Sequence, residues 1–409
     1  SALLVNTTGA YNVAVGALAL DANTTANDNT AVGTSALTAN TTGASNTAIG
    51  ADTLAANTTA ADNTAVGKSA LAANTTADNN TAVGKSALAA NTTGSNLVAV
   101  GRSALEANTT ADDNTALGYG ALAANTTGTR NTAVGKSAGV AITTGTNNTL
   151  VGKETGDALT TGGDNTAIGL EALGTATTAS NNTAVGYAAL YANTSGTSNV
   201  AVGKNSLAAN TTGSYNTAVG EASLLLNTTG DRNTAIGIYA MDANTTADYN
   251  TAIGMYALSE NTTGQRNCSH GYAALGSATT ADDNTAIGYY AAQATTTGAQ
   301  NIALGRSAIE ANTTGANNIG IGANAGETIT TGSHNLMIGT SAGSYDGSDL
   351  TTGSQNICIG NYTKVPAADA AHSITMGYYI TAPGDNYFAF SKASNVVSNL
   401  FTSNANWDH

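Results

Sequence analysis

Charged, aromatic and proline residues are all scarce in this sequence. Asp, Glu, Lys and Arg make up 9% of its 409 residues, whereas an ordinary soluble domain has about 25%. Aromatic residues account for 5% and proline occurs twice, which argues against a conventional enzyme core built on Leu, Phe and Trp. The composition does not indicate disorder either. Disordered tracts are rich in Pro, Glu, Lys and Ser, whereas Ala, Thr, Asn and Gly dominate here.

Positive charge and long apolar runs are also lacking. There are 12 Lys and Arg against 26 Asp and Glu, and the net charge of −14 argues against a nucleic-acid partner held by phosphate contacts. The sequence has no stretch of about 18 apolar residues and no charged and apolar leader at Ser1. We therefore expect neither membrane insertion nor a secretory signal.

Repetition is what the sequence has in abundance. The glycine that ends each NTAVG-like segment recurs every 17 residues from Gly16 to Gly339, and after a four-residue insertion around 345–348 it recurs at Gly360 and Gly377. The 22 units read N-T-A-V-G-x-S-A-L-x-A-N-T-T-[GA]-x-x, and we number the 17 positions from the first Asn. A fixed period of this kind indicates a repeat architecture.

The length and parity of the unit predict the fold class. Seventeen residues are too few for a helical hairpin and fit one coil of a β-solenoid, with two short strands and two corners. We therefore predict an all-β fold, a parallel β-solenoid of the β-roll or β-prism kind. Position 4 is Val, Ile, Leu or Met in every unit except at His270. We expect positions 2 and 4 to point into the core, the small Ala of position 3 to point outward, and the invariant Gly of position 5 to adopt positive φ or meet a crowded backbone.

Positions 9 and 12 vary together. Most units have Leu at position 9 and Asn at position 12, but four units have Gly at position 9 and an apolar residue at position 12: Gly139 with Ile142, Gly156 with Leu159, Gly326 with Ile329, and Gly343 with Leu350. The apolar volume moves and is not lost, so both positions look into the same interior. The Asn residues of position 12 are then expected to stack from coil to coil in a hydrogen-bonded ladder.

The core of a single coil is thin. Each coil is expected to bury about one Val and one Leu, which offsets only part of the backbone entropy lost in ordering its 17 residues. Hydrogen bonds between coils must supply part of the difference, and burial between protomers would supply more. We therefore expect an oligomer, in which a second chain approaches the Ala column of position 3. The alternative is that Ala merely avoids crowding there.

The units resemble two known families. NTAVG and NTAIG followed by SAL resemble the head repeats of trimeric autotransporter adhesins and, more closely, the NTAVG…AL…NTTG arrays of bacteriophage tail fibres, over residues 1–377. The segment NYFAFSKASNVVSNLFTSNANWDH at 386–409 resembles the segment that precedes the self-cleaving intramolecular chaperone of endosialidase-type tail fibres. This resemblance implies an elongated homotrimeric fibre, which ends at His409 after the chaperone is released.

The resemblance also implies function and partners. It implies a structural fibre and host-attachment protein of the virion, or an extracellular or cell-surface one, and not an enzyme. Its partners would be a host cell-surface glycan or protein receptor and an upstream virion or tail component. A bacterial trimeric surface adhesin is the alternative. A third hypothesis comes from the Thr column of position 13, unbroken from Thr24 to Thr351: a monomeric solenoid that binds ice through this ladder.

Two regions are expected along the chain. Residues 1–360 form the repeat shaft, about 105 Å long at about 4.8 Å per coil. All three Phe, the only Trp and both Pro fall after Gly360, so residues 361–409 are expected to form a cap that closes the open edge of the solenoid. The alternative for 361–409 is a receptor-binding tip.

A search for catalytic, cofactor and metal motifs finds none above the repeat background. Cys268 and His270 share one unit and suggest a site, but a tolerated defect in the array is the favoured interpretation. Cys268 and Cys358 are about five coils, or roughly 24 Å, apart, which excludes a disulfide between them. Asp residues at positions 16 and 17, such as Asp112 and Asp113, fit solvated corners better than a calcium site.

Two columns are candidates for recognition. Seven of the 12 cations occupy position 6 and mark an exposed corner: Lys68, Lys85, Arg102, Lys136, Lys153, Lys204 and Arg306. Tyrosines cluster in 187–290, and exposed rings stack on sugars, which predicts a glycan contact at Tyr187, Tyr239, Tyr256, Tyr272, Tyr289 and Tyr290. The alternative is that these tyrosines pack laterally within the shaft.

Overall fold

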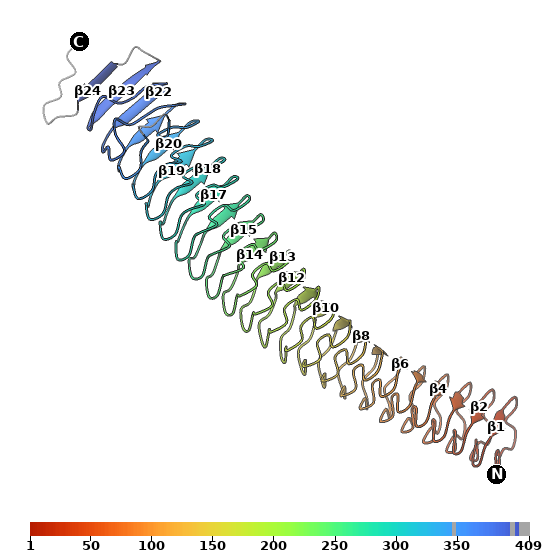
Figure 1. The fold of residues 1–409 in the computed structure, drawn as a ribbon. Coiled ribbons are helices and arrows are strands. Elements are labelled where there is room, and N and C mark those ends of the chain that lie inside the picture. Colours follow the sequence, from red (N-terminus) through yellow and green to blue (C-terminus); the bar gives the residue numbers. More distant parts are fainter. Residues whose placement is uncertain (346–348, 393–396, 401–409) are drawn as a thin grey trace. The chain divides into compact units, whose positions relative to one another are not determined.

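The computed structural model is a parallel β-solenoid with one coil per 17-residue unit (Figure 1). It describes residues 1–345, 349–392 and 397–400, and these contain no helix. The chain divides into two compact units, Ser1–Asn205 with Ala209–Thr212, and Ser206–Ala208 with Gly213–His409. The predicted fold class is thus confirmed for the single chain.

The first unit contains twelve strands of three residues, and β1 to β12 pair in sequence order, in parallel and in register. Thr30 pairs with Thr47 and Val32 with Ile49, one unit apart. The strands are β1 Val13–Val15, β2 Thr30–Val32, β3 Thr47–Ile49, β4 Thr64–Val66, β5 Thr81–Val83, β6 Val98–Val100, β7 Thr115–Leu117, β8 Thr132–Val134, β9 Thr149–Val151, β10 Thr166–Ile168, β11 Thr183–Val185 and β12 Val200–Val202.

In the second unit β13 to β22 also pair in sequence order, in parallel and in register, and the last strands differ. Its strands are β13 Thr217–Val219, β14 Thr234–Ile236, β15 Thr251–Ile253, β16 Cys268–His270, β17 Thr285–Ile287, β18 Ile302–Leu304, β19 Ile319–Ile321, β20 Leu336–Ile338, β21 Ile357–Ile359, β22 Ile374–Tyr378, β23 Tyr387–Lys392 and β24 Val397–Leu400. β23 pairs with β22 in parallel, and β24 pairs with β23 antiparallel. Coil stacking therefore extends past residue 360; the cap or tip role of 361–409 stays a prediction, and Phe401 and Trp407 lie outside the described residues.

The predicted orientation of the strand is wrong. Position 3 points inward, where Ala31, Ala48 and Ala65 are fully buried. Positions 2 and 4 point outward, and Ile49 at position 4 is 41% exposed. The alternation of the strand was predicted correctly, but its inward and outward faces were exchanged. The reason is that the interior is already filled by larger side chains of positions 1, 9 and 12, which leaves room only for a methyl group at position 3.

Two coils with a large residue at position 3 show this competition for space. Leu150 and Met337 are both fully buried. A Cβ added to Gly139 or Gly156 at position 9 would lie 2.7 or 3.0 Å from Leu150, and one added to Gly343 would lie 2.5 Å from the sulfur of Met337. The interior shared by positions 9 and 12 is confirmed, and position 3 belongs to it as well.

The second predicted strand is absent from the described coils. The stretch after the glycine of position 5 consists of turns, with left-handed backbone at positions 7, 9 and 17, as at Ser35 (φ 58°), Leu37 (φ 51°) and Ser45 (φ 59°). A non-glycine residue in this region costs about 1–2 kcal/mol. Bonds between coils offset this cost, since Ser35 N–H donates to Ala17 O at 2.9 Å and Leu37 N–H to Thr53 O at 3.0 Å.

The prediction for position 5 is confirmed. These glycines have φ values between 119° at Gly360 and 145° at Gly377. A Cβ on Gly67 would lie 2.6 Å from the carbonyl oxygen of Gly84 in the next coil. Position 5 therefore combines a backbone conformation and a close approach that only glycine accepts.

The Asn ladder of position 12 is also confirmed. Asn57 Nδ2 donates to Asn40 Oδ1 at 2.8 Å and to Ala60 O at 3.0 Å, and Asn74 repeats the pattern on Asn57. The ladder stops wherever the next coil has an apolar residue at position 12. Within the described residues, the buried Oδ1 atoms of Asn125, Asn261 and Asn312 consequently accept no hydrogen bond; the next coils carry Ile142, Ala278 and Ile329.

A second Asn ladder at position 1 was not predicted. Asn46 is fully buried, its backbone N–H donates to Asn29 Oδ1 at 2.9 Å, and its Nδ2 donates to Asn29 Oδ1 and to Ala60 O. Asn46 Oδ1 in turn accepts from Asn63 N–H at 3.1 Å, so this side chain links its own coil to the coils before and after it. The recurrent Asn before the strand is thus a core residue that satisfies backbone groups at a corner.

The crowding at position 5 predicts a sharp contrast within one coil. Gly118→Ala places a methyl group against the carbonyl of Gly135 at φ +141°, whereas Gly120 at position 7 has φ +65° and open space around its Cβ site. We expect Gly118→Ala to lower the free energy of unfolding by about 3 kcal/mol or more, and Gly120→Ala by at most about 1 kcal/mol. Denaturant unfolding followed by circular dichroism measures both; equal losses would contradict the proposed crowding.

Candidate functional site

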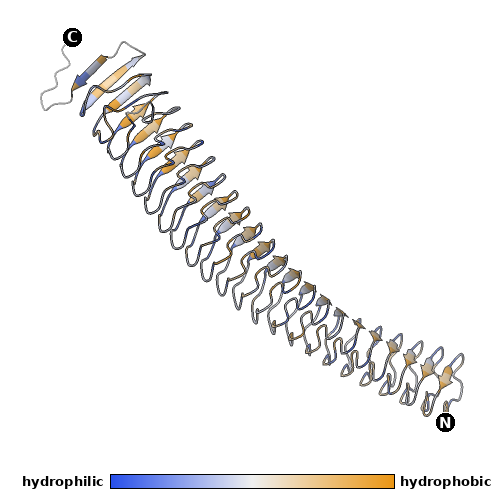
Figure 2. Ribbon diagram, in the orientation of Figure 1, coloured by the Kyte–Doolittle hydropathy of each residue, from blue (hydrophilic) through white to orange (hydrophobic). Residues whose placement is uncertain are grey.

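The outward side chains of positions 2 and 4 form a strip, which we call the β face. Position 4 is apolar in every described coil except that of β16, and position 2 is most often Thr. The β face carries Thr, Val, Ile and Leu in successive coils of each unit, with Leu117 46%, Ile168 40% and Ile287 43% exposed. Figure 2 shows the hydrophobic colouring of the strands along the chain. Isolated exposed apolar residues are ordinary, but a contiguous strip of them marks an interaction surface.

One coil interrupts the β face of the second unit. β16 has Cys268 at position 2, half-buried, and His270 at position 4, exposed. The sequence analysis placed His270 in the core, which is wrong for the same reason as for the whole of position 4. Its register neighbours are Ile253 and Ile287.

Five of the six predicted glycan-contact tyrosines form a continuous ladder in the second unit. Tyr239 stacks on Tyr256 with centroids 5.7 Å apart, and Tyr256 meets Tyr272 edge-on at 6.1 Å. Tyr272 then stacks on Tyr289 at 5.3 Å and contacts Tyr290 at 5.5 Å. The rings come from positions 6 and 7 of four successive coils, and the stacking of one coil on the next brings them together.

The ladder presents ring edges and hydroxyls more than ring faces. Tyr239 and Tyr256 are nearly parallel, at 3°, and Tyr272 and Tyr289 are at 15°, so much of the face area is used between neighbours. The hydrogen bond to Tyr289, together with its proximity, raises the pKa of Tyr290 to about 12. This geometry supports lateral packing, and it leaves sugar-stacking area mainly at the ends of the ladder.

The sixth tyrosine lies apart. Tyr187 belongs to the first unit, is 47% exposed and makes no ring contact within the described residues. In the same unit the position-6 cations Lys68, Lys85, Lys136 and Lys153 are all exposed. Arg102 lies over the ring of Tyr119, 5.8 Å from its centroid. The predicted exposed corner is confirmed for these side chains.

A column at position 17 of the second unit was missed. Arg232 lies 5.4 Å from the ring centroids of both Tyr215 and Tyr249, and its Nη1 donates to Tyr249 Oη at 3.1 Å. Arg266 makes a bidentate pair with Asp283, at 2.7 and 3.0 Å, which lowers the pKa of the Asp283 carboxyl. The 17-residue spacing of these residues was the available signal.

A second aromatic cluster lies near the carboxyl end. Tyr345, Tyr362, Tyr378 and Tyr379 have neighbouring centroids 4.8–6.1 Å apart, and the hydroxyls of Tyr345 and Tyr379 are hydrogen-bonded at 2.7 Å. Lys364 Nζ lies 5.1 Å from the Tyr345 centroid. Tyr362, Tyr378 and Tyr379 lie in 361–409, the region that was singled out by its Phe, Trp and Pro residues. Phe388 and Phe390 of that region also lie close together, with ring centroids 5.7 Å apart.

The Asp residues of position 16 have a structural partner. Asp78 Oδ1 accepts from Ala61 N–H at 2.7 Å, and Asp112 Oδ1 accepts from Ser95 N–H at 2.7 Å. Each carboxylate therefore joins its corner to that of the preceding coil. Among the described residues, no group of three or more His, Cys, Asp or Glu is placed to hold a metal ion.

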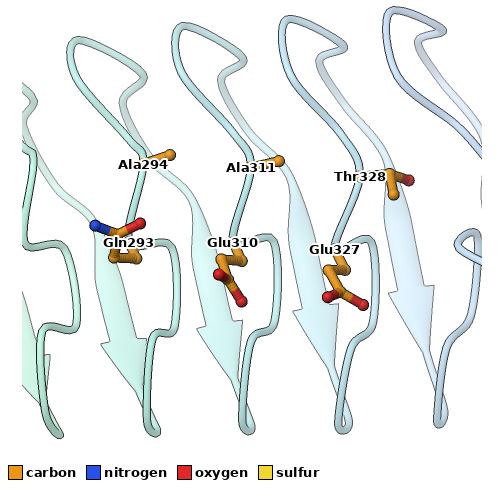
Figure 3. A pocket seen from close by; sticks show the side chains of 6 residues that line it. All are labelled: Gln293, Ala294, Glu310, Ala311, Glu327 and Thr328. Atoms are coloured by element: carbon orange, nitrogen blue, oxygen red, sulfur yellow. The ribbon is translucent and has the colours of Figure 1, made fainter.

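The second unit has a hollow of about 300 Å³ lined by Gln293, Ala294, Glu310, Ala311, Glu327 and Thr328. Figure 3 shows these side chains. These are positions 10 and 11 of three successive coils, and their side chains stand in a row. The two carboxylates are the only ionisable groups of the lining, which offers no nucleophile paired with a base.

The two cysteines are unpaired, as expected from their separation. Cys358 is buried at position 3, and burial raises the pKa of its thiol to about 12. The part of the chain that the structure describes has no helix long and apolar enough to cross a bilayer. No protein-family model matches the chain, and no curated protein matches its sequence.

The coupling of Tyr290 to its neighbours predicts an alkaline effect on stability. Because the pKa of Tyr290 is raised from 10.0 to about 12 in the folded chain, its contribution is fully present below pH 10 and is lost as the pH rises towards 12. We expect the thermal midpoint of Tyr290→Phe to fall less over this range than that of the wild type. Tyr187→Phe is the matched control, since it removes one hydroxyl outside the ladder; an identical pH dependence of all three proteins would contradict the coupling.

Proposed function

We propose that the chain is a non-enzymatic fibre protein that self-associates through its β face into a homotrimer and attaches a virion to its host cell, as a bacteriophage tail fibre. The β face carries this proposal. Its position 4 is apolar in every described coil except that of β16, and these side chains are half-buried or exposed in the single chain. The trimeric state and the tail-fibre identity come from the resemblance of the repeats, which supports the proposal without testing it.

The size of the β face fits a stable interface. Twelve strands of three residues or more, at about 4.8 Å spacing and about 3.3 Å per residue, make a strip of roughly 600 Å² in each unit. A standard interface buries about 800 Å² per partner, so the strip of one unit is of the same order of size as one such interface. Covering the strip also adds the apolar burial that the thin coil interior lacks. We propose the contact at positions 2 and 4, because the Ala column, where it was expected, is buried inside the coil.

In this proposal the receptor surface is formed by other columns, at positions 6 and 7. The tyrosine ladder offers hydroxyls and ring edges, and the position-6 corner of the first unit offers cations. Both repeat with the coil, which suits a repetitive ligand such as a cell-surface glycan. A bacterial surface adhesin would use the same faces, and a membrane anchor encoded in the same gene would favour that alternative.

The ice-binding hypothesis has less support. The Thr hydroxyls of position 13 donate their protons to backbone carbonyls of the next coil, as from Thr41 to Thr58 at 3.0 Å and from Thr58 to Thr75 at 3.1 Å. They are half-buried and serve the solenoid itself. A lack of thermal hysteresis in solution would dismiss this function.

Self-association through the β face predicts the effect of charge on assembly. The wild type should have three times the chain mass of 40.1 kDa by light scattering coupled to size exclusion. Ile49→Lys with Ile287→Lys puts one charge on the β face of each unit, and we expect it to dissociate the assembly at least tenfold more readily, because an unpaired charge would be buried.

The matched control is Thr42→Lys with Thr280→Lys, which adds the same charge at exposed position 14 and should leave the mass unchanged. A wild-type mass near 40.1 kDa would contradict the proposed trimer. Dissociation by the control pair as well would show that added charge, and not the β face, is responsible.

Attachment through the tyrosine ladder makes a separate prediction. Replacing Tyr272 and Tyr289 by Ala removes a stacked pair of rings, with their edges and hydroxyls, from two successive coils of the ladder, and we expect binding of the labelled fibre to host cells to fall about tenfold with no change in mass. Tyr11→Ala is the control for loss of an exposed ring, since Tyr11 is 87% exposed and is not among the predicted glycan contacts. Unchanged adsorption of the double variant would contradict the glycan contact at the ladder and would leave the proposed assembly of the fibre standing.

A further inference from the structure

Two departures from the repeat coincide in one coil. β16 reads Cys268-Ser269-His270 where the neighbouring strands read Thr-Ala-Ile. Cys268 is the only cysteine at position 2, and His270 is the only residue at position 4 that is not Val, Ile, Leu or Met. Both departures concern residues whose side chains ligate metals.

The coil itself is unaffected by these departures. Ser269 takes the inward position 3, is fully buried, and donates to Ala274 O at 2.6 Å. β16 keeps its register with β15 and β17. The changes of chemistry are therefore confined to the outward side, where Cys268 and His270 are two residues apart on one strand and point to the same side of it.

A cysteine and a histidine held side by side are a pair of soft and borderline donors suited to Zn²⁺, which binds four such ligands in its structural sites. One chain supplies only two here, and no third ligand joins them among the described residues. A site on this strand is therefore incomplete in a single copy. Copies that pack through the β face in register bring the same coil of each chain to the same level, and two copies already provide four donors.

We propose that Cys268 and His270 form an intersubunit Zn²⁺ site on the β face, completed by the same two residues of the associated copies. This inference rests on the self-association proposed above. An imidazole and a thiol enclosed in an otherwise apolar contact would each lack a partner, which is unfavourable; a bound metal satisfies both. Zn²⁺ would then link the copies at this coil and stabilise the assembly by mass action.

Metal content and mass, measured on the same sample, test the site. The full chain is refolded or dialysed with Zn²⁺, freed of excess, and analysed for metal and for mass; Co²⁺ in place of Zn²⁺ reports thiolate ligation by its charge-transfer and d–d absorption. We expect the amount of bound metal to rise in proportion to the amount of assembled protein. We also expect the thermal midpoint of unfolding to fall when a chelator removes the metal.

Three variants sharpen the test. Cys268→Thr with His270→Ile restores the repeat, so it should fold and assemble but bind no metal and ignore the chelator. Cys358→Ala removes the buried thiol and should bind as the wild type. Thr251→Cys with Ile253→His copies the pair onto β15 and should double the metal bound per assembly.

The outcomes separate the two proposals. An assembly of the expected mass that holds no more metal than the repeat-restored variant overturns the zinc site and leaves self-association standing. Metal bound by a chain that remains at 40.1 kDa overturns the intersubunit arrangement and the self-association together. Cobalt spectra without thiolate bands would exclude Cys268 as a ligand.

Discussion

The in-register stacking of one coil directly on the next is the constraint on which the rest of the structure depends. It is held where the position-5 glycine of each coil meets the carbonyl of the next at a distance that leaves no room for a Cβ, as between Gly67 and Gly84. With the backbones so close, the N–H groups of the left-handed positions find carbonyls in neighbouring coils, and their strain is offset. Every residue then lies directly against the same position of its neighbours, so a sequence column becomes a column in space.

Inside the solenoid this stacking lets identical polar side chains of successive coils form hydrogen bonds with one another. Two Asn columns, at positions 1 and 12, donate and accept along the stack, and each amide also reaches a backbone carbonyl. The ladder of position 12 breaks off where Ile142 follows Asn125, which leaves one carbonyl oxygen buried without a donor, and it resumes between Asn193 and Asn210. Gly replaces Leu at position 9 in the coils that carry Ile or Leu at position 12. The apolar side chain of position 12 needs the space that Leu normally fills at position 9.

The repeat length, the strand and the shared interior of positions 9 and 12 were predictable because each leaves a direct mark on the sequence. The phase of the strand was not, since a period of two fits either face and the apolar rule favoured Val and Ile over Ala. A subtler signal was present: Leu150 and Met337, the large residues at position 3, occur beside glycines at position 9. The left-handed leucines have no sequence mark, because Leu is an unusual residue for that backbone region. The spacing of the tyrosines indicated that they gather on one part of the chain. That their ring faces pack against one another is visible only in the structure.

Outward columns are under a different constraint, since they do not contribute to the packing of their own coil. Side chains there can change without affecting the fold, as position 6 shows by carrying Lys, Arg, Tyr, Leu or Ala in different coils. Position 4 is equally outward and yet is apolar in every coil except that of β16, while position 2 is Thr in most coils. The single solenoid does not require an apolar residue at position 4, and the proposed contact between copies gives a reason for one. The thiol and the imidazole of β16 leave the coil itself unchanged, because the inward Ser269 preserves its packing. In the proposed contact, a metal ion shared between copies would satisfy both groups.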